Sequence, residues 1–502
     1  MPTNLWPDDD SYNQCDSVSS LLSDLSEMEE EPDNPFERGQ EGRRRKAAVV
    51  LTVIWTGTIV LHLVSWGTWF VLGLTTLMSL HALRVILARP LVPSQPLADD
   101  DDPDQFPYVS LLVAAKNEEA VIGNLVRMLC NLDYPACRYD LWVINDNSTD
   151  RTPILLDQLA QEYDRLHVIH RSANATGGKS GALNQVWPMT RADIIAVFDA
   201  DARVSRDMLR HVVPLFQRSE VGAVQVRKAI LQADPESGTG LSGNFWIQGQ
   251  MAEMAMDTYY QQQRIAIGGI GELRGNGQFV RRQALQDCGG WNEQTITDDL
   301  DLTLRLHLNQ WDIDCLAVPA VQEEGVTTVL SLWHQRNRWA EGGYQRYLDY
   351  WRLILTNRMG FRKTYDLAMF WLIQYGLPTA AIPDVLMGLL RNRLPILSPI
   401  TTLSLSLSLM WTFMGLRRVQ RLENRLRKER GQTPRCMSFP MLMMTLLQAL
   451  RGTFYMLHWV PVMTSTTARM AVRPKRLKWV KTIHHGTGDV WVDLAEETEK
   501  TA

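Results

Sequence analysis

The chain contains few cysteines, and their spacing excludes two kinds of small domain: those stabilised by a bound zinc ion and those stabilised by disulfides. Six cysteines occur among 502 residues, with no Cys-x-x-Cys pair and no histidine at the spacing of a zinc site. Neither a metal knuckle nor a disulfide framework is therefore indicated. We expect the main folded part of the chain to lie in the reducing cytosol.

A long segment near the N-terminus lacks charged residues. Residues 47–83 contain no Asp, Glu, Lys or Arg. At ~1.5 Å per residue they would form roughly 55 Å of helix, which is too long for one crossing of a ~30 Å hydrocarbon core. We therefore predict two transmembrane helices over 43–89, with a turn near 65–67. Basic residues flank both ends of this pair, which places the following domain in the cytosol by the positive-inside rule.

The two signs of charge are separated along the chain, although the net charge is only -5. Residues 1–42 are acidic and poor in large apolar side chains, so we predict a disordered acidic N-terminal tail. Prolines and an acidic run predict a solvated linker over 90–106. Basic runs lie next to apolar runs at 417–435 and in 464–502, which indicates a lipid bilayer as a partner and no nucleic acid.

The C-terminal part, 353–463, contains three apolar stretches. Residues 367–390 and 394–416 have membrane length, and we predict two spans there, although Asp384 would sit inside the first. The third stretch, 439–463, is interrupted by Arg451 and followed by the basic tail, 464–502. A full crossing there would put this tail outside the cell, against the positive-inside tendency. We therefore predict a re-entrant or interfacial segment, and a cytosolic, partly ordered tail.

Between the apolar blocks, residues 107–352 alternate short apolar strands with amphipathic helices. Strands are predicted at 109–115, 141–145, 167–170, 194–198 and 223–227. This rhythm is typical of a doubly wound α/β sheet. The expected architecture is thus an α/β, Rossmann-like cytosolic domain flanked by transmembrane helices.

Two carboxylates, Asp199 and Asp201, directly follow the predicted strand at 194–198. Hard divalent cations take oxygen ligands and often share substrate phosphates, so this pair is a candidate site for Mg²⁺ or Mn²⁺ beside a diphosphate. A lone Asp-x-Asp is also common in solvated turns. The assignment therefore depends on the motifs that accompany it.

Three polar segments follow other predicted strands, at the edge where ligands of such sheets bind. Asn117 and Glu118 follow the first strand, and Asp146 follows the second, so they predict a nucleotide pocket; helix capping is the alternative reading. Lys179 follows two glycines and, with backbone N–H groups up to Asn184, can face a diphosphate. An alanine replaces the first glycine of a phosphate loop, which excludes an ATPase. A glycine turn with a solvated lysine is the alternative.

The motif Thr297, Asp298, Asp299 opens a predicted helix, where carboxylates also suit the helix N-terminus. Inverting sugar transfer needs a carboxylate that removes the acceptor's hydroxyl proton while the oxygen attacks the anomeric carbon opposite the leaving diphosphate. We assign this base to Asp299.

A third motif, at 335–339, combines cations with an aromatic ring. Arg338 can neutralise the charge on a departing nucleotide diphosphate, and the ring of Trp339 can form the floor of the acceptor site. Gln335 and Arg336 are candidates for the same acceptor and diphosphate contacts. An amphipathic helix at the membrane surface is the alternative reading.

In this order, the three motifs resemble those of the family 2 inverting glycosyltransferases, which include cellulose, chitin and poly-N-acetylglucosamine synthases. The match spans 107–352. It implies a GT-A fold in which the Asp-x-Asp binds metal and UDP, Asp299 is the base, and Gln-x-x-Arg-Trp binds diphosphate and acceptor. Asp146, Lys179 and Asn184 resemble the family's UDP contacts. Asp298 stands where the family usually has Glu.

Within that family, segments 268–282, 333–350 and 464–481 are similar to membrane glycolipid synthases of cyanobacteria, over almost the full chain. This resemblance implies UDP-glucose as the donor, 1,2-diacylglycerol as the acceptor, Mg²⁺ as the metal, and a multi-pass location in cyanobacterial membranes. A processive polysaccharide synthase is the alternative, although four predicted spans provide little for a translocation pore. A non-enzymatic membrane scaffold that keeps the nucleotide fold is a third.

Overall fold

The computed structural model describes residues 36, 42–91, 94–98, 106–231, 244–433 and 438–472. The predicted acidic tail at 1–42 lies almost entirely outside the described residues. So do part of the predicted linker at 90–106 and the basic tail beyond Val472.

A seven-stranded mixed sheet forms the centre of the domain, in the order β3-β2-β1-β4-β6-β5-β7. The first four strands are parallel and match the predicted ones. They are β1 (Val109–Ala115), β2 (Tyr139–Asn145), β3 (Leu166–His170) and β4 (Ile194–Phe198). The fifth predicted strand extends in both directions as β5 (Val221–Ile230).

The other half of the sheet departs from the doubly wound prediction. The strand β6 (Gln278–Arg281) runs antiparallel to both β4 and β5, and β7 (Asp312–Glu323) pairs parallel with β5. Neither was predicted, because β6 has only four residues and β7 carries acidic side chains and a proline. A sheet of this kind is mixed, with an inserted antiparallel strand.

Helices cover both faces of the sheet and divide its core into two clusters. They are α4 (Ile122–Cys130), α5 (Thr152–Glu162), α6 (Gly178–Val186), α7 (Met208–Val212), α9 (Arg282–Asp287) and α10 (Asp298–Leu308), with short 3₁₀ turns at Ala136–Arg138, Trp187–Met189 and Val213–Gln217. One cluster takes its apolar side chains from α4, α5 and α7, the other from α6, α9 and α10. Both clusters pack against the sheet, which fixes its strand ends for the site described below.

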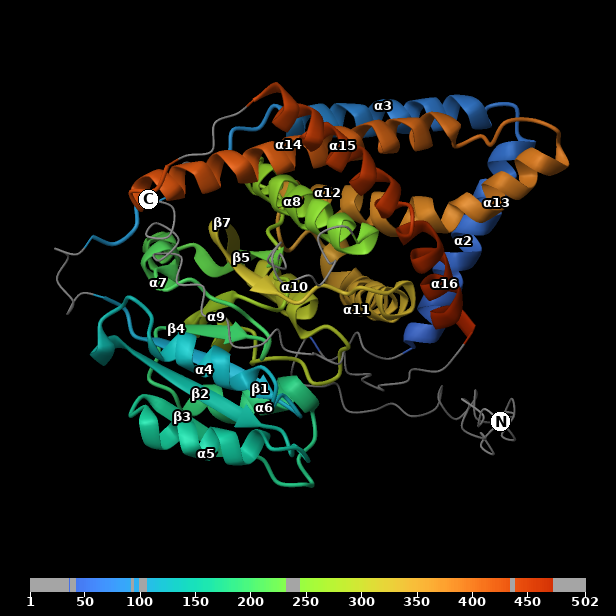
Figure 1. The fold of residues 1–502 in the computed structure, drawn as a ribbon. Coiled ribbons are helices and arrows are strands. Elements are labelled where there is room, and N and C mark those ends of the chain that lie inside the picture. Colours follow the sequence, from blue (N-terminus) through green and yellow to red (C-terminus); the bar gives the residue numbers. More distant parts are fainter. Residues whose placement is uncertain are drawn as a thin grey trace, which may run out of the picture.

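A helical part packs on the β5–β7 side of the domain (Figure 1). It comprises α2 (Arg43–Leu63), α3 (Gly67–Ile86), α8 (Phe245–Ala266), α11 (Val329–Leu355), α12 (Phe361–Trp371), a π-helical turn (Leu372–Gly376), α13 (Leu377–Leu390), α14 (Ser398–Glu429), α15 (Phe439–Met456) and α16 (Trp459–Val472). Figure 1 shows α3 and α14 side by side across the top, with α8 between them and the sheet. Helix α2 contacts α13 and α16.

Among the described residues, three helices are long and apolar enough to cross a membrane: α2, α3 and α14. The first two match the predicted pair, and α14 covers the predicted span at 394–416. The span predicted at 367–390 is not among them, because the π turn divides that stretch into α12 and α13. The stretch at 439–463 is divided between α15 and α16. How α12, α13, α15 and α16 lie relative to a bilayer stays a prediction.

Asp384, the acid inside the apolar stretch, has a structural explanation. Its Oδ1 lies 2.8 Å from His62 Nε2 of α2 and accepts the backbone N–H of Ile396 at 2.8 Å. Burying a carboxylate is costly unless it is paired and hydrogen-bonded, and here both conditions are met. The side chain thus joins α2, α13 and the turn that precedes α14.

Candidate active site

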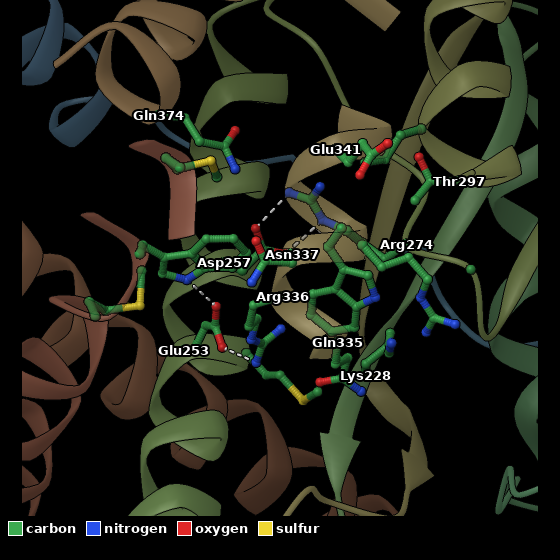
Figure 2. A pocket seen from close by; sticks show the side chains of 18 of the residues that line it. Lys228, Glu253, Asp257, Arg274, Thr297, Gln335, Arg336, Asn337, Glu341 and Gln374 are labelled. Atoms are coloured by element: carbon green, nitrogen blue, oxygen red, sulfur yellow. Dashed lines mark hydrogen bonds and ion pairs between the residues drawn. The ribbon is translucent and has the colours of Figure 1, made fainter. Parts of the chain in front are cut away.

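The carboxyl ends of β1, β2 and β4 open into one large cavity of about 2050 Å³. Most of the site residues predicted from the sequence line it: Glu118, Asp146, Lys179, Asp199, Asp201, Asp299, Gln335, Arg336, Arg338 and Trp339. Asn117 and Asn184 are not part of the lining that the described residues provide. Figure 2 shows the part of this cavity around the third motif. The fold therefore brings all three motifs to one place.

Asp199 and Lys179 form the centre of the diphosphate end. Lys179 Nζ lies 2.5 Å from Asp199 Oδ1, and the backbone N–H of Asp199 donates to Asn276 Oδ1 at 3.2 Å. Partial burial disfavours the charged form, but the ion pair with Lys179 outweighs it and holds the pKa of Asp199 below its ordinary value. An ionised carboxylate with Asp201 two residues on can hold a hard divalent cation. No group of three or more metal-ligating side chains occurs in the described ranges.

Arg171, which the sequence analysis did not single out, organises the neighbouring loop. Its buried guanidinium donates to Asp146 Oδ1 at 2.5 Å, to the Thr176 carbonyl at 2.6 Å and to the Gly178 carbonyl at 3.2 Å. Gly177 has φ +81°, and a Cβ there would lie 2.2 Å from the Glu293 carboxylate. Arginine thus fixes Asp146 and the glycine loop together, and the loop requires glycine at this position.

The two asparagines outside the cavity hold loops in place. The Asn117 N–H donates to Ser148 Oγ at 2.9 Å, and its Oδ1 accepts the Thr149 N–H at 2.7 Å. Asn184 Nδ2 donates to the Trp291 carbonyl at 2.7 Å and to Glu293 at 2.9 Å. Their direct contact with a nucleotide stays a prediction, and the geometry gives them a supporting position.

Asp299 has the environment of a general base. It lies in the first turn of α10, and burial together with the neighbouring carboxylate of Asp298 raises its pKa to about 6. The Asp298 Oδ2 atom is buried and has no hydrogen-bond partner in the described part of the chain. Gly275, at φ +83°, leaves room beside Asp299, since a Cβ there would lie 3.5 Å from Asp299 Oδ2. A hydroxyl group can therefore approach this carboxylate.

Arg336 is held inside the protein. Its guanidinium donates to Glu253 Oε2 at 2.5 Å (Figure 2). It also donates to the Tyr455 hydroxyl at 3.0 Å and lies 4.1 Å from the centre of the Trp339 ring. A buried arginine needs such a partner, because an unpaired one is strongly destabilising. This arrangement makes Arg336 a support for Trp339, and contact with a diphosphate stays a prediction.

Trp339 lies next to a positively charged side chain, whereas Arg338 lies next to negatively charged ones. Lys228 Nζ lies 5.3 Å from the centre of the Trp339 ring and 2.9 Å from Glu323 Oε2. Burial lowers the pKa of Arg338, while the nearby carboxylates of Asp199 and Asp299 act in the opposite direction and keep it charged. The site thus combines a cation-flanked aromatic ring with an arginine beside the acidic residues. Lys228 and Glu323 were missed by the sequence analysis.

A buried ionic network supports the floor of the cavity. Glu272 lies 2.6 Å from Arg346, 2.8 Å from Arg274 and 3.5 Å from Arg264. Arg264 continues the network to Asp366 at 2.8 Å. These residues come from α8, α11, α12 and the loop before β6, so the network fixes the helical part to the domain.

Comparison with known proteins places the chain among sugar-transferring enzymes. Residues 107–342 match the family described as glycosyltransferase like family 2. The chain is 62% identical over 493 residues to a beta-monoglucosyldiacylglycerol synthase of Nostoc sp. (strain PCC 7120 / SAG 25.82 / UTEX 2576), covering 97% of this chain and 100% of that protein. It is 53% identical over 499 residues to a protein of the same name from Synechocystis sp. (strain ATCC 27184 / PCC 6803 / Kazusa), covering 99% and 100%.

Among solved structures, a mannosyltransferase from Pyrobaculum calidifontis, in complex with GDP-Man and Mn²⁺, is similar with a TM-score of 0.48 at 18% identity, covering 82% of this chain and 99% of that one. The mixed sheet and the family match together give the α/β, GT-A-like fold that the sequence motifs implied.

Proposed function

Because the chain belongs to the glycosyltransferase like family 2, in the group of the beta-monoglucosyldiacylglycerol synthases, we propose that it is a membrane-bound inverting glucosyltransferase. It moves glucose from UDP-glucose to the free hydroxyl of 1,2-diacylglycerol and forms beta-monoglucosyldiacylglycerol for membrane glycolipid synthesis. The observation that carries this proposal is the 62% identity over 97% of the chain and the whole length of the relative. Substrate sites seldom change across so close a match of the entire chain.

The donor lies at the end of the cavity that contains Asp146, Lys179, Asp199 and Asp201. Asp199 and Asp201 hold Mg²⁺, or Mn²⁺, which when bound neutralises part of the charge of the diphosphate. Two carboxylates leave room for phosphate and water ligands, which is the usual way Mg²⁺ is shared between protein and nucleotide. Lys179 and the backbone N–H groups of the glycine loop bind the remaining phosphate oxygens.

Transfer is a single displacement at the anomeric carbon. Asp299 removes the proton of the diacylglycerol hydroxyl as its oxygen forms a bond to the anomeric carbon. The bond from that carbon to the diphosphate oxygen breaks on the opposite face, and UDP leaves with the electron pair. Arg338 stabilises the charge that grows on the leaving diphosphate. Attack from the opposite face converts the α-linked donor to a β-glucoside.

The helical part brings this site to the lipid. Helices α2, α3 and α14 anchor the chain in the bilayer, and the domain stays on the cytosolic side. A diacylglycerol hydroxyl lies at the bilayer surface, so a site pressed against the membrane reaches it without extracting the lipid. The polysaccharide synthase alternative is not favoured, since the relatives that match the whole chain are named for a monoglucosyl lipid.

The test is product analysis. Purified protein in detergent, mixed with radiolabelled UDP-glucose, Mg²⁺ and diacylglycerol, is expected to put label into a lipid spot on thin-layer chromatography. Treatment with β-glucosidase should release that label, and omission of diacylglycerol should abolish it. Label that stays at the origin as lipase-insensitive polymer would contradict the proposal and favour polysaccharide synthesis.

A further inference from the structure

The cavity does not end at the catalytic carboxylates. It continues into the helical part, where its lining comes from the π turn, α13, α14, α15 and α16. There the lining includes a group of aliphatic side chains, Ile373, Leu377, Ala381, Val385, Leu397, Ile400, Leu405, Leu457, Val460 and Met463, together with hydroxyl-bearing ones, Ser398, Thr401, Thr402, Ser404, Ser408 and Thr453. We call this inner region the apolar chamber. Its lining differs sharply from the charged nucleotide end of the same cavity.

One face of α14 forms a wall of the apolar chamber. Ile400, Ser404, Ser408 and Trp411 all line it, and their spacing of three to four residues places them on one side of the helix. Ser406, two positions after Ser404, does not line it and is exposed. The Ser408 hydroxyl oxygen is buried and has no hydrogen-bond partner among the residues described. Of the serines in the Leu–Ser alternation of α14, Ser404 and Ser408, four residues apart, thus lie on the chamber side, and Ser406 does not.

The chamber opens at the apolar outer surface of the helical part. Val385 of α13 and Leu405 of α14 line the chamber, yet 47% and 41% of their surfaces are exposed. Helix α14 is one of the three helices with the length and composition to cross a membrane. Large exposed aliphatic side chains at a cavity mouth mark a lipid-facing opening, because they gain nothing from contact with water.

Two further polar side chains line the cavity. Gln374 lies in the π turn and Gln335 in α11, and both line the cavity (Figure 2). The side-chain oxygen of each is buried and has no hydrogen-bond partner within the part of the chain that the structure describes. Short π-helical turns occur frequently at functional sites. An unused amide oxygen can accept a hydrogen bond from the hydroxyl group of a glycerol backbone.

We propose that the apolar chamber binds the acyl chains of the diacylglycerol acceptor, which enter sideways from the bilayer, with Gln374 at the glycerol backbone. This inference rests on the proposed function, and adds the place and direction of acceptor binding. The aliphatic side chains of α13 and of the α15–α16 segment offer no partners to sugar hydroxyls, which favours acyl chains over a sugar polymer. Acyl chains need only apolar surface, and continuity with the site of Asp299 brings the acceptor hydroxyl to the base.

The test fills the chamber and varies the acceptor chain length. Ser404→Trp places an indole in the chamber, whereas the matched control Ser406→Trp places the same group on the outer side of the same helix. With dioleoylglycerol, Ser404→Trp should lower kcat/KM by about 10-fold or more, as overpacking does. With dioctanoylglycerol, and for hydrolysis of UDP-glucose, it should stay within about 2-fold of wild type. Ser406→Trp should stay within about 2-fold in every assay.

Two results would overturn the inference. One is that Ser404→Trp uses dioleoylglycerol as well as wild type does. The other is an equal loss with both acceptors while UDP-glucose hydrolysis is intact. If wild type glucosylates neither acceptor, the proposed function itself fails, which is a separate outcome.

A second measurement does not depend on a variant that folds. Wild-type protein in vesicles is irradiated with a diacylglycerol that carries a diazirine at the end of one acyl chain, and labelled residues are mapped by mass spectrometry. Adducts on chamber residues such as Ala381, Ser404 and Leu405 are expected. Adducts confined to residues outside the chamber, such as Leu386 and Ser406, would contradict the inference.

Discussion

At the scale of single residues, the proposed chemistry depends on one carboxylate whose pKa is raised above its ordinary value. Asp299 lies buried at the start of α10 beside a second carboxylate, and both features raise its pKa to about 6. A base with a pKa just below the operating pH is unprotonated and still basic enough to accept a proton. Replacing Asp299 with Asn is an informative test at this buried position, because Asn has nearly the same shape and removes the negative charge.

Replacing the base should abolish most turnover. We expect Asp299→Asn to lower the rate of lipid glucosylation on the order of 10²-fold or more, the usual contribution of a general base. Binding of UDP to the purified protein, measured by calorimetry, should be close to that of wild type. A variant with near-normal turnover would show that another group accepts the proton.

The pH dependence of kcat/KM should reflect the interaction between the carboxylates of Asp298 and Asp299. Below pH about 6 Asp299 becomes protonated, so kcat/KM should fall as the pH decreases. Above that pH, kcat/KM should reach its maximum. Asp298→Asn removes the neighbouring negative charge that raises the pKa of Asp299, and the acid limb should move to lower pH. The profile of kcat/KM between pH 5 and 8 measures this shift. An unchanged acid limb in the variant would contradict the coupling.

The sequence predicted residues that belong to short motifs and missed those defined by distant partners. Asp199, Asp299 and Trp339 could be found because their neighbours in sequence carry the same chemistry. Arg171 could not, since its role comes from Asp146 and from two carbonyl groups that only the folded loop brings near. Lys228 likewise has a role only because β5 and β7 are adjacent, which brings Glu323 to it.

At the scale of elements, the position of the base depends on how closely α10 and α11 approach. A Cβ placed on Gly342 of α11 would lie 2.2 Å from Thr297 Oγ1, directly before α10. Glycine at this point lets the two helices that carry the second and third motifs meet. The motif spacing alone does not reveal this contact.

A pair of glycine substitutions tests this contact. Gly342→Ala should force Thr297 and the first turn of α10 to shift, costing about 1–3 kcal/mol of stability, with a loss of turnover of about 10-fold. In the matched control, Gly57→Ala in α2, an added Cβ meets nothing within 4 Å, and the change should be neutral or slightly stabilising. Thermal unfolding in detergent and the glucosylation rate measure both effects. Equal behaviour of the two variants would argue against a tight contact.

The elements that could be predicted are those with a regular pattern. Three of the four parallel strands, β1, β2 and β4, are mostly apolar and buried, so their hydrophobicity was sufficient, whereas β3 is a short strand with a histidine at its second and last positions that pairs only with β2. The strands β6 and β7 contain polar residues and gain their stability from neighbours in the sheet, which outweighs local propensity. The stretch at 367–390 has the composition of a span, but the π turn at Leu372–Gly376 and Pro383 interrupt its regular helix.

At the scale of the whole molecule, three helix ends are held by groups within residues 107–352, in α11, directly after α8 and directly before α7. Arg43 at the start of α2 donates to Asp349 at 2.7 Å, and Arg84 at the end of α3 donates to the carbonyl of Ile267 at 2.9 Å. Arg430, directly after α14, donates to Asp207 at 2.6 Å. Basic residues at membrane boundaries are retained on the cytoplasmic side, and here they also form contacts within the protein. In the topology that we propose, in which α2 and α3 cross the membrane, the turn between them lies on the opposite side of the bilayer.

This topology can be tested by cysteine labelling in spheroplasts of an expression host. In a background that lacks the native cysteines, Ser65→Cys in the α2–α3 turn should react with a membrane-impermeant maleimide while the membrane is intact. A matched variant that retains only Cys137, which is exposed on the domain, should react only after permeabilisation. The reason is that two consecutive helices that both cross the bilayer, with their outer ends on the cytosolic side, place the turn between them on the other side. Labelling of both positions from the same side would show that α2 and α3 lie at the interface, and the domain would then need another anchor.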